Sequence, residues 1–476
     1  MILHVLISAG IGLRVLMRRP ATGVALAWIL FVVTLPFGGA AVYLIIGERR
    51  LDPWRAKRLL MQHDDFRDLC DAMIADGLTA VDWSRHTTAV RGMDRLGRHA
   101  SGSPTVHGST IELLSDTQAI FRRLAQDIEA AETSLLMEFY IWDEGGAAGD
   151  ILEAVIRAAG RGVACRLLID ALGARPWWRG AQPKRLRDAG VELRMALPVG
   201  LFRTIVGRTD LRLHRKIAVI DGRVAWTGSM NLVDPRFFKR DAGVGQWVDA
   251  MTRIEGAAVA PLTAIVTGDW MVEAGEKLPE LMANVGLNHV TQKGDADVQV
   301  IPSGPGAAGN ALLQMLLAII NAAERELVIT TPYLIPDDSL LWALRGAAGR
   351  GVKVRLILPE KVDSILTRYA SRSYYEDLLG AGIDIHFYRG GLLHTKSLMV
   401  DERLAMFGTV NFDMRSLWLN YEVALFIYDP GFAASLHALQ RHYLAQSERL
   451  EPKAWAARSL STRFIEDALR LAAPLL

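Results

Sequence analysis

Two apolar stretches lie at the start of the chain. Residues 21–47 include no charged side chain over 27 positions, which exceeds the roughly 20 residues that a helix needs to cross a bilayer. Because Pro36 lies inside this stretch, the pattern predicts a kinked membrane-spanning helix, with a re-entrant hairpin as the alternative. Residues 1–17 are apolar except for His4 and Arg14, which predicts a second, shorter span. No basic region precedes the apolar run, so we do not expect a cleaved signal peptide.

Basic residues around these stretches indicate an orientation. Three arginines at positions 14, 18 and 19 separate the two stretches, and a larger basic cluster follows at 49–58. Because positive charge stays on the cytoplasmic side, we expect the rest of the chain in the cytoplasm. At the other end, residues 460–476 place Leu460, Phe464, Ala468 and Leu471 on one face of an amphipathic helix. That helix lies either on the membrane surface or against the body of the protein.

The body of the chain contains an internal repeat. The segment AAGRGVACRLLID (158–170) matches AAGRGVKVRLILP (347–359), and the flanking segments 135–142 and 189–194 correspond to 327–336 and 381–387 in the same order. Each copy has the pattern of a buried strand, an amphipathic helix and a second buried strand. The sequence therefore predicts an α/β fold with two related α/β/α lobes, facing each other across a pseudo-twofold axis.

The repeat sets the expected domain boundaries. We predict a membrane segment at 1–50, a juxtamembrane connector at 51–110, a first lobe at 111–285 and a second lobe at 286–476 that includes the C-terminal amphipathic helix. A lobe linker is expected at 284–297.

Composition narrows the class of protein. Apolar residues make up 51% of the 476 residues and the net charge is +2. The first fifty residues hold five arginines and one glutamate, so the remaining body is slightly acidic, which argues against a nucleic-acid partner. Cys70 and Cys165 are the only cysteines, which excludes a disulfide framework and a thiolate metal cluster.

The second halves of the two repeats contain one shared motif. It consists of His, Lys, Asp, Gly, Ser or Thr, and Asn at fixed spacing. The first copy comprises His214, Lys216, Asp221, Gly228, Ser229 and Asn231, and the second comprises His394, Lys396, Asp401, Gly408, Thr409 and Asn411. In a strand, His and Lys two residues apart point to the same face. Asp221-Gly222 predicts a hairpin turn that returns Ser229 and Asn231 beside them.

Two such lobes would gather two histidines, two lysines and two asparagines in one cleft. Displacement at a phosphodiester needs a nucleophile on one side and a proton donor for the leaving oxygen on the other, and two facing histidines supply both. The lysines and asparagines would bind the phosphate oxygens without a metal or other cofactor. A covalent phosphohistidine would allow a second alcohol, or water, to accept the group.

Other residues are further candidates. Asp249 and Glu422 occupy equivalent strand positions after each motif and would orient a histidine ring through a hydrogen bond, or else are surface carboxylates. Arg203, Arg208 and Arg212 would contact an anionic headgroup or form a solvated amphipathic segment. Tyr140 and Tyr333 lie at matching strand ends and either line the cleft or pack in the core.

The doubled motif resembles the HKD signature of the phospholipase D superfamily. The surrounding strings, HRKIAVIDGRVAWTGSMNLVDPRFFKRDAGVGQWVD and GGLLHTKSLMVDERLAMFGTVNFDMRSLWLNYEVAL, are similar to bacterial cardiolipin synthases of that superfamily. The N-terminal segment ending in GERR is similar as well, so the resemblance covers nearly the whole chain. It implies an enzyme of the bacterial inner membrane that joins two phosphatidylglycerol molecules into cardiolipin and releases glycerol.

The resemblance also implies residue roles. His214 would be the nucleophile and His394 the acid that protonates departing glycerol and then the base for the incoming alcohol, although the two roles are interchangeable on the sequence. Lys216, Lys396, Asn231 and Asn411 would bind phosphate, and Asp221 and Asp401 would brace the motif. Asp249 and Glu422 match positions that pair with the histidines. Thr409 replaces the family's usual Ser and keeps the hydroxyl. The substrate-binding set expected here comprises Ser229, Asn231, Thr409, Asn411, Asp249 and Glu422.

Three alternatives remain at this stage. A phospholipase or anchored nuclease would use the same residues with water as the acceptor, although the acidic body disfavours a polyanionic substrate. Phosphatidylethanolamine could replace one phosphatidylglycerol. A catalytically silent scaffold would be expected to carry a broken motif, and neither copy is broken. The expected partners are phosphatidylglycerol and other anionic lipids, and the sequence leaves homo-oligomerisation open.

Overall fold

A computed structural model of the chain describes residues 2–18, 22–35, 37–47, 58, 68, 78–198, 210–276, 291–305 and 310–471. The chain divides into two compact units. One unit comprises residues 1–57 and 199–211, and the other comprises residues 58–198 and 212–476.

The first unit is built around a helical hairpin. Helix α1 (Ile2–Arg18) packs against α2 (Thr22–Thr34), and the short helix α3 (Gly38–Val42) continues into a π-helical turn, η1 (Tyr43–Gly47). The His4 ring donates a hydrogen bond to the Val33 carbonyl oxygen at 3.1 Å. Val15 and Val32 are each 1% exposed and form the centre of this small apolar cluster.

The apolar stretch 21–47 is divided rather than continuous. Helix α2 ends at Thr34 and α3 begins at Gly38, with Phe37 between them at a positive φ. None of the described helices, in either unit, combines the length and the apolarity needed to span a bilayer. The membrane-spanning helices expected from the sequence therefore stay a prediction.

A single mixed sheet is the framework of the second unit. Its 15 strands follow the order β19-β13-β12-β10-β15-β16-β18-β9-β1-β8-β6-β5-β2-β3-β4. Two additional pairs, β11 with β17 and β14 with β7, lie outside it. The strands are β1 (Thr105–Leu114), β2 (Ser134–Phe139), β3 (Ala164–Asp170), β4 (Glu192–Ala196), β5 (Ile217–Ile220), β6 (Val224–Gly228), β7 (Trp247–Val248), β8 (Met251–Gly256), β9 (Ala296–Ser303), β10 (Glu326–Thr330), β11 (Leu334–Ile335), β12 (Lys353–Pro359), β13 (Asp384–Tyr388), β14 (Leu392–Leu393), β15 (Ser397–Val400), β16 (Leu404–Gly408), β17 (Phe412–Asp413), β18 (Glu422–Ile427) and β19 (Ser447–Arg449).

The strand order shows the repeat directly. From β1 outward the first half contains β8, β6, β5, β2, β3 and β4, and from β9 outward the second half contains β18, β16, β15, β10, β12 and β13. The strands β1 and β9 pair antiparallel at the centre and join the two halves. In both copies the expected unit of strand, helix and parallel strand is present, as β2-α7-β3 and β10-α14-β12. The α/β fold predicted from the sequence is confirmed.

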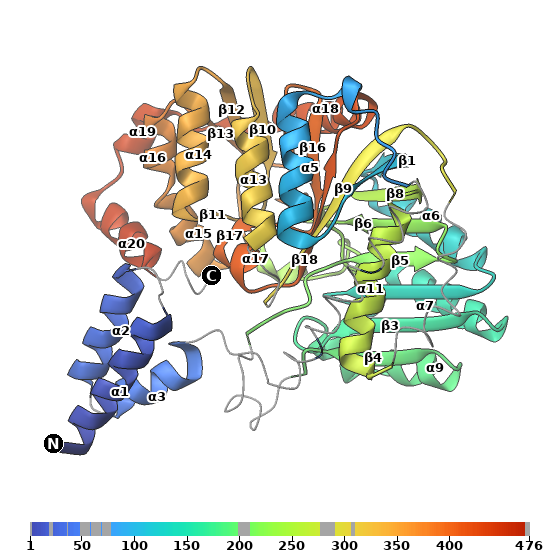
Figure 1. Cartoon of the computed structure of the whole chain (residues 1–476), viewed down its shortest axis with the longest axis horizontal. Helices are drawn as coiled ribbons and strands as arrows, with labels where there is room; N and C mark the ends of the chain where they lie inside the picture. The colour runs from blue at the N-terminus through green and yellow to red at the C-terminus, as the bar shows by residue number, and fades with distance from the viewer. Residues whose placement is uncertain are drawn as a thin grey trace. The chain divides into compact units, whose positions relative to one another are not determined.

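Helices cover both faces of the sheet (Figure 1). Helices α11 and α18 lie on one face and share an apolar core with strands of both halves. On the other face α6, α7 and α9 cover the first half, and α5, α13, α14 and α16 cover the second. The helices are η2 (Trp83–Arg85), α5 (Thr88–Ser101), α6 (Thr117–Glu129), α7 (Ala147–Gly160), α8 (Arg175–Trp178), α9 (Gln182–Asp188), η3 (Arg240–Ala242), α11 (Val259–Ala274), α13 (Ala311–Asn321), α14 (Asp338–Gly349), α15 (Ile365–Arg372), α16 (Tyr375–Gly380), α17 (Met414–Trp418), α18 (Pro430–Ala445), α19 (Pro452–Ala456) and α20 (Leu460–Arg470).

The expected domain boundaries differ from the observed elements at one point. The boundary between connector and first lobe, at residue 110, falls inside β1, and α5 from the expected connector packs against α13. The later part of the connector is thus integrated into the sheet, because β1 forms half of the central strand pair. The lobe boundary at 285 lies outside the described residues, and most of the expected linker does too.

Asp221 and Asp401 fix the tight turns that follow β5 and β15. The Asp221 carboxylate accepts hydrogen bonds from the backbone N–H groups of Glu132, Thr133 and Ser134 at 2.8 to 2.9 Å. Asp401 accepts the equivalent three, from residues 324–326, at 2.7 to 2.9 Å. Both residues of the Asp221-Gly222 turn have positive φ, and β5 pairs antiparallel with β6, so the predicted hairpin is confirmed. Each carboxylate ties its hairpin to the start of the neighbouring strand.

We predict that Asp221→Ala and Asp401→Ala each lower the free energy of unfolding by about 3 kcal/mol, because three backbone donors lose a charged acceptor. Asp116→Ala is the matched control. Asp116 only caps α6, through one bond from the Ala119 N–H, and its loss should cost about 1 kcal/mol. Denaturant unfolding measures the free energy of unfolding of each variant. If Asp221→Ala loses no more stability than Asp116→Ala, the bracing role is contradicted.

The contribution of the Asp221 carboxylate to the free energy of unfolding should also depend on pH. Burial raises the pKa of Asp221, but the hydrogen bonds from Ser134, Glu132 and Thr133 outweigh it and hold that pKa below its usual value. A carboxyl with a lowered folded pKa stabilises the fold above its unfolded pKa, and this stabilisation is lost as pH falls through the folded pKa. The stability difference between the wild type and Asp221→Ala should therefore shrink on acidification.

Candidate active site

Each motif histidine is held by backbone pairing with the other half of the sheet. Leu213 forms a parallel bridge with Tyr421, and the His214 N–H donates to the Tyr421 carbonyl oxygen at 2.9 Å. In the second copy β14 pairs in parallel with β7, and the His394 N–H donates to the Val248 carbonyl oxygen at 2.8 Å. The two histidines therefore lie where the two halves meet.

The histidine rings are paired across the halves with buried carboxylates. Nδ1 of His214 lies 2.9 Å from a Glu422 carboxylate oxygen, and Nδ1 of His394 lies 2.7 Å from Oδ1 of Asp249. The exposed fraction of each carboxylate residue is 3% or less. An ionised carboxylate at this position fixes the ring proton on Nδ1 and leaves Nε2 with a lone pair. Each half thus supplies one histidine and the carboxylate that orients the other.

The hydroxyl groups of the motifs bind these same carboxylates. Ser229 Oγ donates to Asp249 Oδ1 at 2.6 Å, and Thr409 Oγ1 donates to Glu422 Oε2 at 2.6 Å. Both side chains are fully buried. Four members of the substrate-binding set expected from the sequence, Ser229, Thr409, Asp249 and Glu422, therefore support the histidines, and we propose them as positioning residues.

The two motif lysines are fully buried beside the histidines. Nζ of Lys216 donates to the His214 carbonyl oxygen at 2.5 Å, and Nζ of Lys396 donates to the His394 carbonyl oxygen at 2.5 Å. Burial lowers the pKa of Lys216 to about 8 and that of Lys396 to about 7, although Glu422 and Asp249 oppose the shift. A site with such lysines gains positive charge readily when an anion enters.

Burial and the neighbouring charged groups together set the charge of the rings and carboxylates. It lowers the pKa of His214 and of His394 to about 4 despite the facing carboxylates, so both rings are neutral near pH 7. Burial raises the pKa of Glu422, but His214 and Lys216 outweigh it and the pKa is lowered overall. The pKa of Asp249 is lowered likewise, with His394 and Lys396 opposing burial. The site therefore holds neutral imidazoles against ionised carboxylates.

The two motif asparagines have different surroundings. Asn231 Oδ1 accepts a hydrogen bond from the Ile141 N–H at 3.1 Å. Asn411 Oδ1 is buried without a hydrogen-bond partner among the described residues. The side chain of Asn411 interacts with Asp413, whose pKa is raised by burial to about 6.

Aromatic rings flank the histidines differently in the two copies. The Tyr140 ring is edge-on to His214, with ring centroids 5.1 Å apart, and Lys216 Nζ lies 5.6 Å from the Tyr140 centroid. Tyr333, at the matching position, instead donates from its hydroxyl to Asp363 at 2.7 Å. Trp247 contacts His394, with centroids 4.4 Å apart. Tyr140 thus contacts His214, and the ring that contacts His394 is Trp247, which comes from the first half.

Two residues next to the site, Arg215 and Lys239, were not identified from the sequence. Arg215 points away from its motif neighbours: it donates to the carbonyl oxygens of Glu422 and Ser303 at 3.0 and 2.9 Å and pairs with Asp269. Lys239 pairs with Asp363 at 3.1 Å and lies 5.5 Å from the Trp247 ring centroid. Both groups connect the two halves, and neither carries a local sequence signal because the partners are far apart in the chain.

Other expected residues lie apart from the histidines. Asp221 and Asp401 follow the far ends of β5 and β15 from the histidines, where they brace the turns. Arg203 and Arg208 lie outside the described residues, while Arg212 is buried, 7% exposed, next to the Leu213 bridge.

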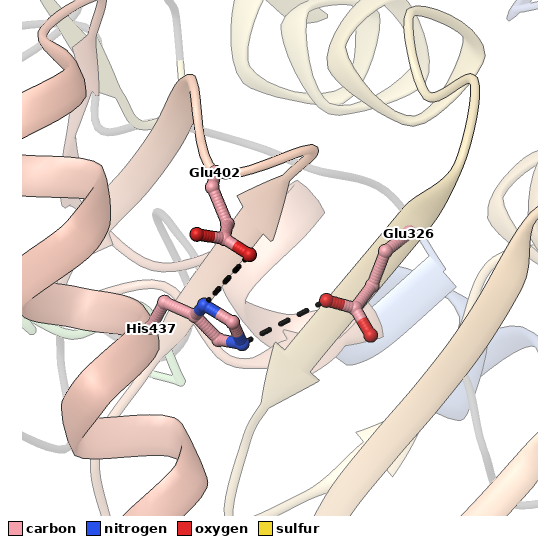
Figure 2. A group of neighbouring side chains, drawn as sticks. All are labelled: Glu326, Glu402 and His437. Atoms are coloured by element: carbon pink, nitrogen blue, oxygen red, sulfur yellow. Dashed lines mark ion pairs between the residues drawn. The ribbon is translucent and has the colours of Figure 1, made fainter.

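One group of described residues has the composition of a metal site (Figure 2). Glu326 at the start of β10, Glu402 in the turn after β15 and His437 on α18 converge, with His437 nitrogens 3.7 and 3.2 Å from the two carboxylates. Glu326 also pairs with Arg355. The group lies at the opposite end of β15 from His394, and its contacts form an ion-pair cluster of the outer surface.

The sequence matches one protein family twice. Residues 124–250 and 316–443 each match the family described as Cardiolipin synthase, PLD-like domain, and residues 7–48 match the one described as Phospholipase D-nuclease N-terminal. Cardiolipin synthase A of Erwinia tasmaniensis is 42% identical over 472 residues, which cover 99% of this chain and 96% of the relative. Cardiolipin synthase A of Edwardsiella ictaluri is 42% identical over 475 residues, with the same coverage of both chains.

A solved structure shares the fold. Phosphatidylserine synthase of Haemophilus influenzae aligns with a TM-score of 0.62 at 16% identity, over 82% of this chain and all of that one. Its likeness, together with the doubled family match and the repeated strand order, confirms the expected phospholipase D-like α/β architecture. The chain therefore belongs to the phospholipase D-like cardiolipin synthase family.

Proposed function

We propose that this chain is a cardiolipin synthase, a phosphatidyltransferase that moves a phosphatidyl group from one phosphatidylglycerol to another and releases glycerol. The observation that carries the proposal is the pair of buried histidines, each oriented by a carboxylate of the opposite half and accompanied by a buried lysine. The relatives named cardiolipin synthase A, similar over nearly their whole length, support the substrate assignment.

In the first step His214 attacks the phosphodiester. Because Glu422 holds the proton on Nδ1, Nε2 of His214 presents its lone pair to phosphorus and forms a P–N bond. The bond from phosphorus to the glycerol headgroup oxygen breaks, and His394, protonated on Nε2 once the anionic diester is bound, gives that proton to the departing oxygen. Lys216 and Lys396 offset the charge on the non-bridging oxygens, with Asn231 and Asn411 as neutral donors.

In the second step His394 acts as a base. It removes the proton from a glycerol hydroxyl of the second phosphatidylglycerol, whose oxygen attacks phosphorus while the P–N bond breaks. Cardiolipin leaves and His214 returns to its neutral form. The phosphohistidine conserves the free energy of the broken diester, so no nucleotide is required. Water as the acceptor would give phosphatidic acid, and phosphatidylethanolamine as the donor would release ethanolamine.

We also propose that the enzyme is attached to the inner membrane through residues 1–50, with its larger unit in the cytoplasm. The long uncharged stretch and the basic cluster at 49–58 support this proposal. Helices α1 and α2 expose several leucines and valines, among them Leu3 at 60% and Leu30 at 66%, which suits an apolar environment.

The first test is mass spectrometry of the products that the purified protein forms in liposomes of phosphatidylglycerol alone. We expect cardiolipin and glycerol in equal amounts, and a loss of at least about 1,000-fold in His214→Ala and in His394→Ala, since each removes a reacting group. His99→Ala, an exposed position on α5, is the control and should retain activity. Phosphatidic acid without cardiolipin would make the protein a phospholipase, and appreciable activity in either active-site variant would overturn the mechanism.

The two histidine roles can be separated with a diester whose leaving group is p-nitrophenolate, which departs without a proton. His394→Ala should then still release nitrophenol in a burst and retain the labelled phosphatidyl group on the protein. His214→Ala should do neither. The reverse pattern would exchange the two assignments.

The lowered pKa values of Lys216 and Lys396 predict that the site binds anions more weakly as pH rises. Sulfate is the probe because its charge does not change between pH 5 and 9. As pH rises through about 7 for Lys396 and about 8 for Lys216, the free site loses positive charge. The sulfate dissociation constant should therefore increase by up to about tenfold per pH unit between pH 7 and 8, where one proton is linked to binding, and more steeply above pH 8, where both lysines take up a proton. Lys396→Gln should flatten the lower part of this dependence, and a wild-type constant unchanged from pH 6 to 9 would refute it.

A further inference from the structure

Three of the four charged side chains of helix α20 form ion pairs with the body of the protein, and the fourth, Asp467, is exposed. Glu466 is 1% exposed and pairs with Arg372 on α15 at 2.5 Å, and also with Arg458. Arg463 pairs with Glu376 at 2.6 Å, and Arg470 pairs with Asp377 at 3.2 Å. These contacts fix the rotation of α20 about its axis against α15 and α16.

The apolar side of α20 is consequently turned outward. Leu460 is 82% exposed, Phe464 75% and Leu471, directly after the helix, 85%. Ile365 at the start of α15, the helix that α20 packs against, is 75% exposed. A surface helix in water ordinarily buries its apolar face and hydrates its charges, whereas α20 buries Glu466 and exposes Leu460 and Phe464, with Asp467 as the one charged side chain of α20 on the exposed side. We call Leu460, Phe464, Leu471 and Ile365 the apolar strip. Isolated exposed apolar side chains are common, but a strip on two packed helices indicates a binding surface.

The apolar strip is connected to the candidate active site. Ile365 lies two residues after Asp363, which accepts a hydrogen bond from Tyr333 and pairs with Lys239 at 3.1 Å. Lys239 lies over the Trp247 ring, and Trp247 contacts His394. Phe237, two residues before Lys239 in the sequence, is 57% exposed. An exposed apolar side chain therefore lies two residues along the chain from each partner of the ion pair that adjoins His394.

We propose that the apolar strip, with Phe237, is the surface by which the catalytic unit rests on the lipid bilayer. This inference rests on the proposed function, because a lipid substrate has its phosphodiester at the bilayer surface, next to the acyl chains that the strip would contact. The exposed Lys361 and Arg368 flank the first turn of α15 and suit anionic headgroups. The ion pairs between α20 and the body of the protein already fix the apolar face outward in the free protein. Contact with the bilayer therefore costs little additional conformational entropy.

The contact is tested with a polarity-sensitive fluorophore on the full-length protein. It is attached at Phe464→Cys and, as the control, at Lys184→Cys, whose side chain is 82% exposed on α9 of the other half. Cys70→Ser removes the second label site, and buried Cys165 is retained. With vesicles of dioleoyl phosphatidylglycerol, the emission of the fluorophore at position 464 should shift to shorter wavelength. Lipids brominated in the acyl chain should quench that emission. The fluorophore at position 184 should show neither effect. Equal responses at both positions, or none at Phe464, would overturn the proposal.

Activity supplies a second, independent readout. The triple variant Leu460→Ser, Phe464→Ser, Leu471→Ser loses no buried contact, so its thermal unfolding should match the wild type. Its turnover on phosphatidylglycerol in vesicles should fall about tenfold, through a raised apparent KM, while turnover of a short-chain phosphatidylglycerol dissolved as monomers should not change. The apolar control, Leu460→Met, Phe464→Leu, Leu471→Met, should behave as wild type on both.

The possible outcomes separate the two proposals. If the wild type makes no cardiolipin, the proposed function fails whatever the fluorophore reports. If the wild type is active and the serine variant is equally active on vesicles, the lipid-contact surface fails alone. If the Phe464 probe shifts to the blue without lipid as the protein is concentrated, and the serine variant lowers the molecular mass in solution, the strip binds a second copy of the chain and the lipid assignment is wrong.

Discussion

The cross-paired histidine and carboxylate are the constraint on which the site depends. Neither half of the sheet holds a complete pair: His214 needs Glu422, and His394 needs Asp249. An unpaired buried carboxylate would be costly, because burial alone disfavours its ionised form. The two halves must therefore close on each other in register before either histidine acquires its orientation. The central β1–β9 pair and the parallel bridges at Leu213 and β14 set that register.

The buried charge makes the site a receptor for an anion. Two lysines and two carboxylates, all nearly inaccessible to water, balance one another in the free protein. A diester phosphate adds a negative charge, which favours the protonated lysines and the protonated form of one imidazole. Binding of the anionic diester thus favours the protonated imidazole that donates a proton to the leaving group. An uncharged ligand would not favour that protonated form.

The sequence was most informative where structure is local or repeated. The AAGRGV repeat, the strand and helix alternation and the Asp221-Gly222 turn each depend on neighbouring residues, and all were predicted at their observed places. The doubled motif also identified the residues that meet at the site. It did not show that Ser229 and Thr409 donate to the carboxylates. Nor did it show that Arg215 donates to the Glu422 carbonyl oxygen or that Trp247 contacts His394, since these two contacts join distant segments of the two halves. The strand β1, which spans the expected boundary between connector and first lobe, was missed for the same reason: its partner, β9, lies far along the chain.

Two chemically identical histidines can take different roles only if their surroundings differ. Among the described residues, Glu422 accepts hydrogen bonds from Thr409, Ser416 and Asn420 besides that of His214. Asp249 accepts one from Ser229 besides that of His394. Donors that share a carboxylate disperse its charge and weaken its pull on the imidazole proton. Asp249 should therefore support a protonated ring better than Glu422 does, which favours His394 as the residue that carries the proton and leaves His214 as the nucleophile.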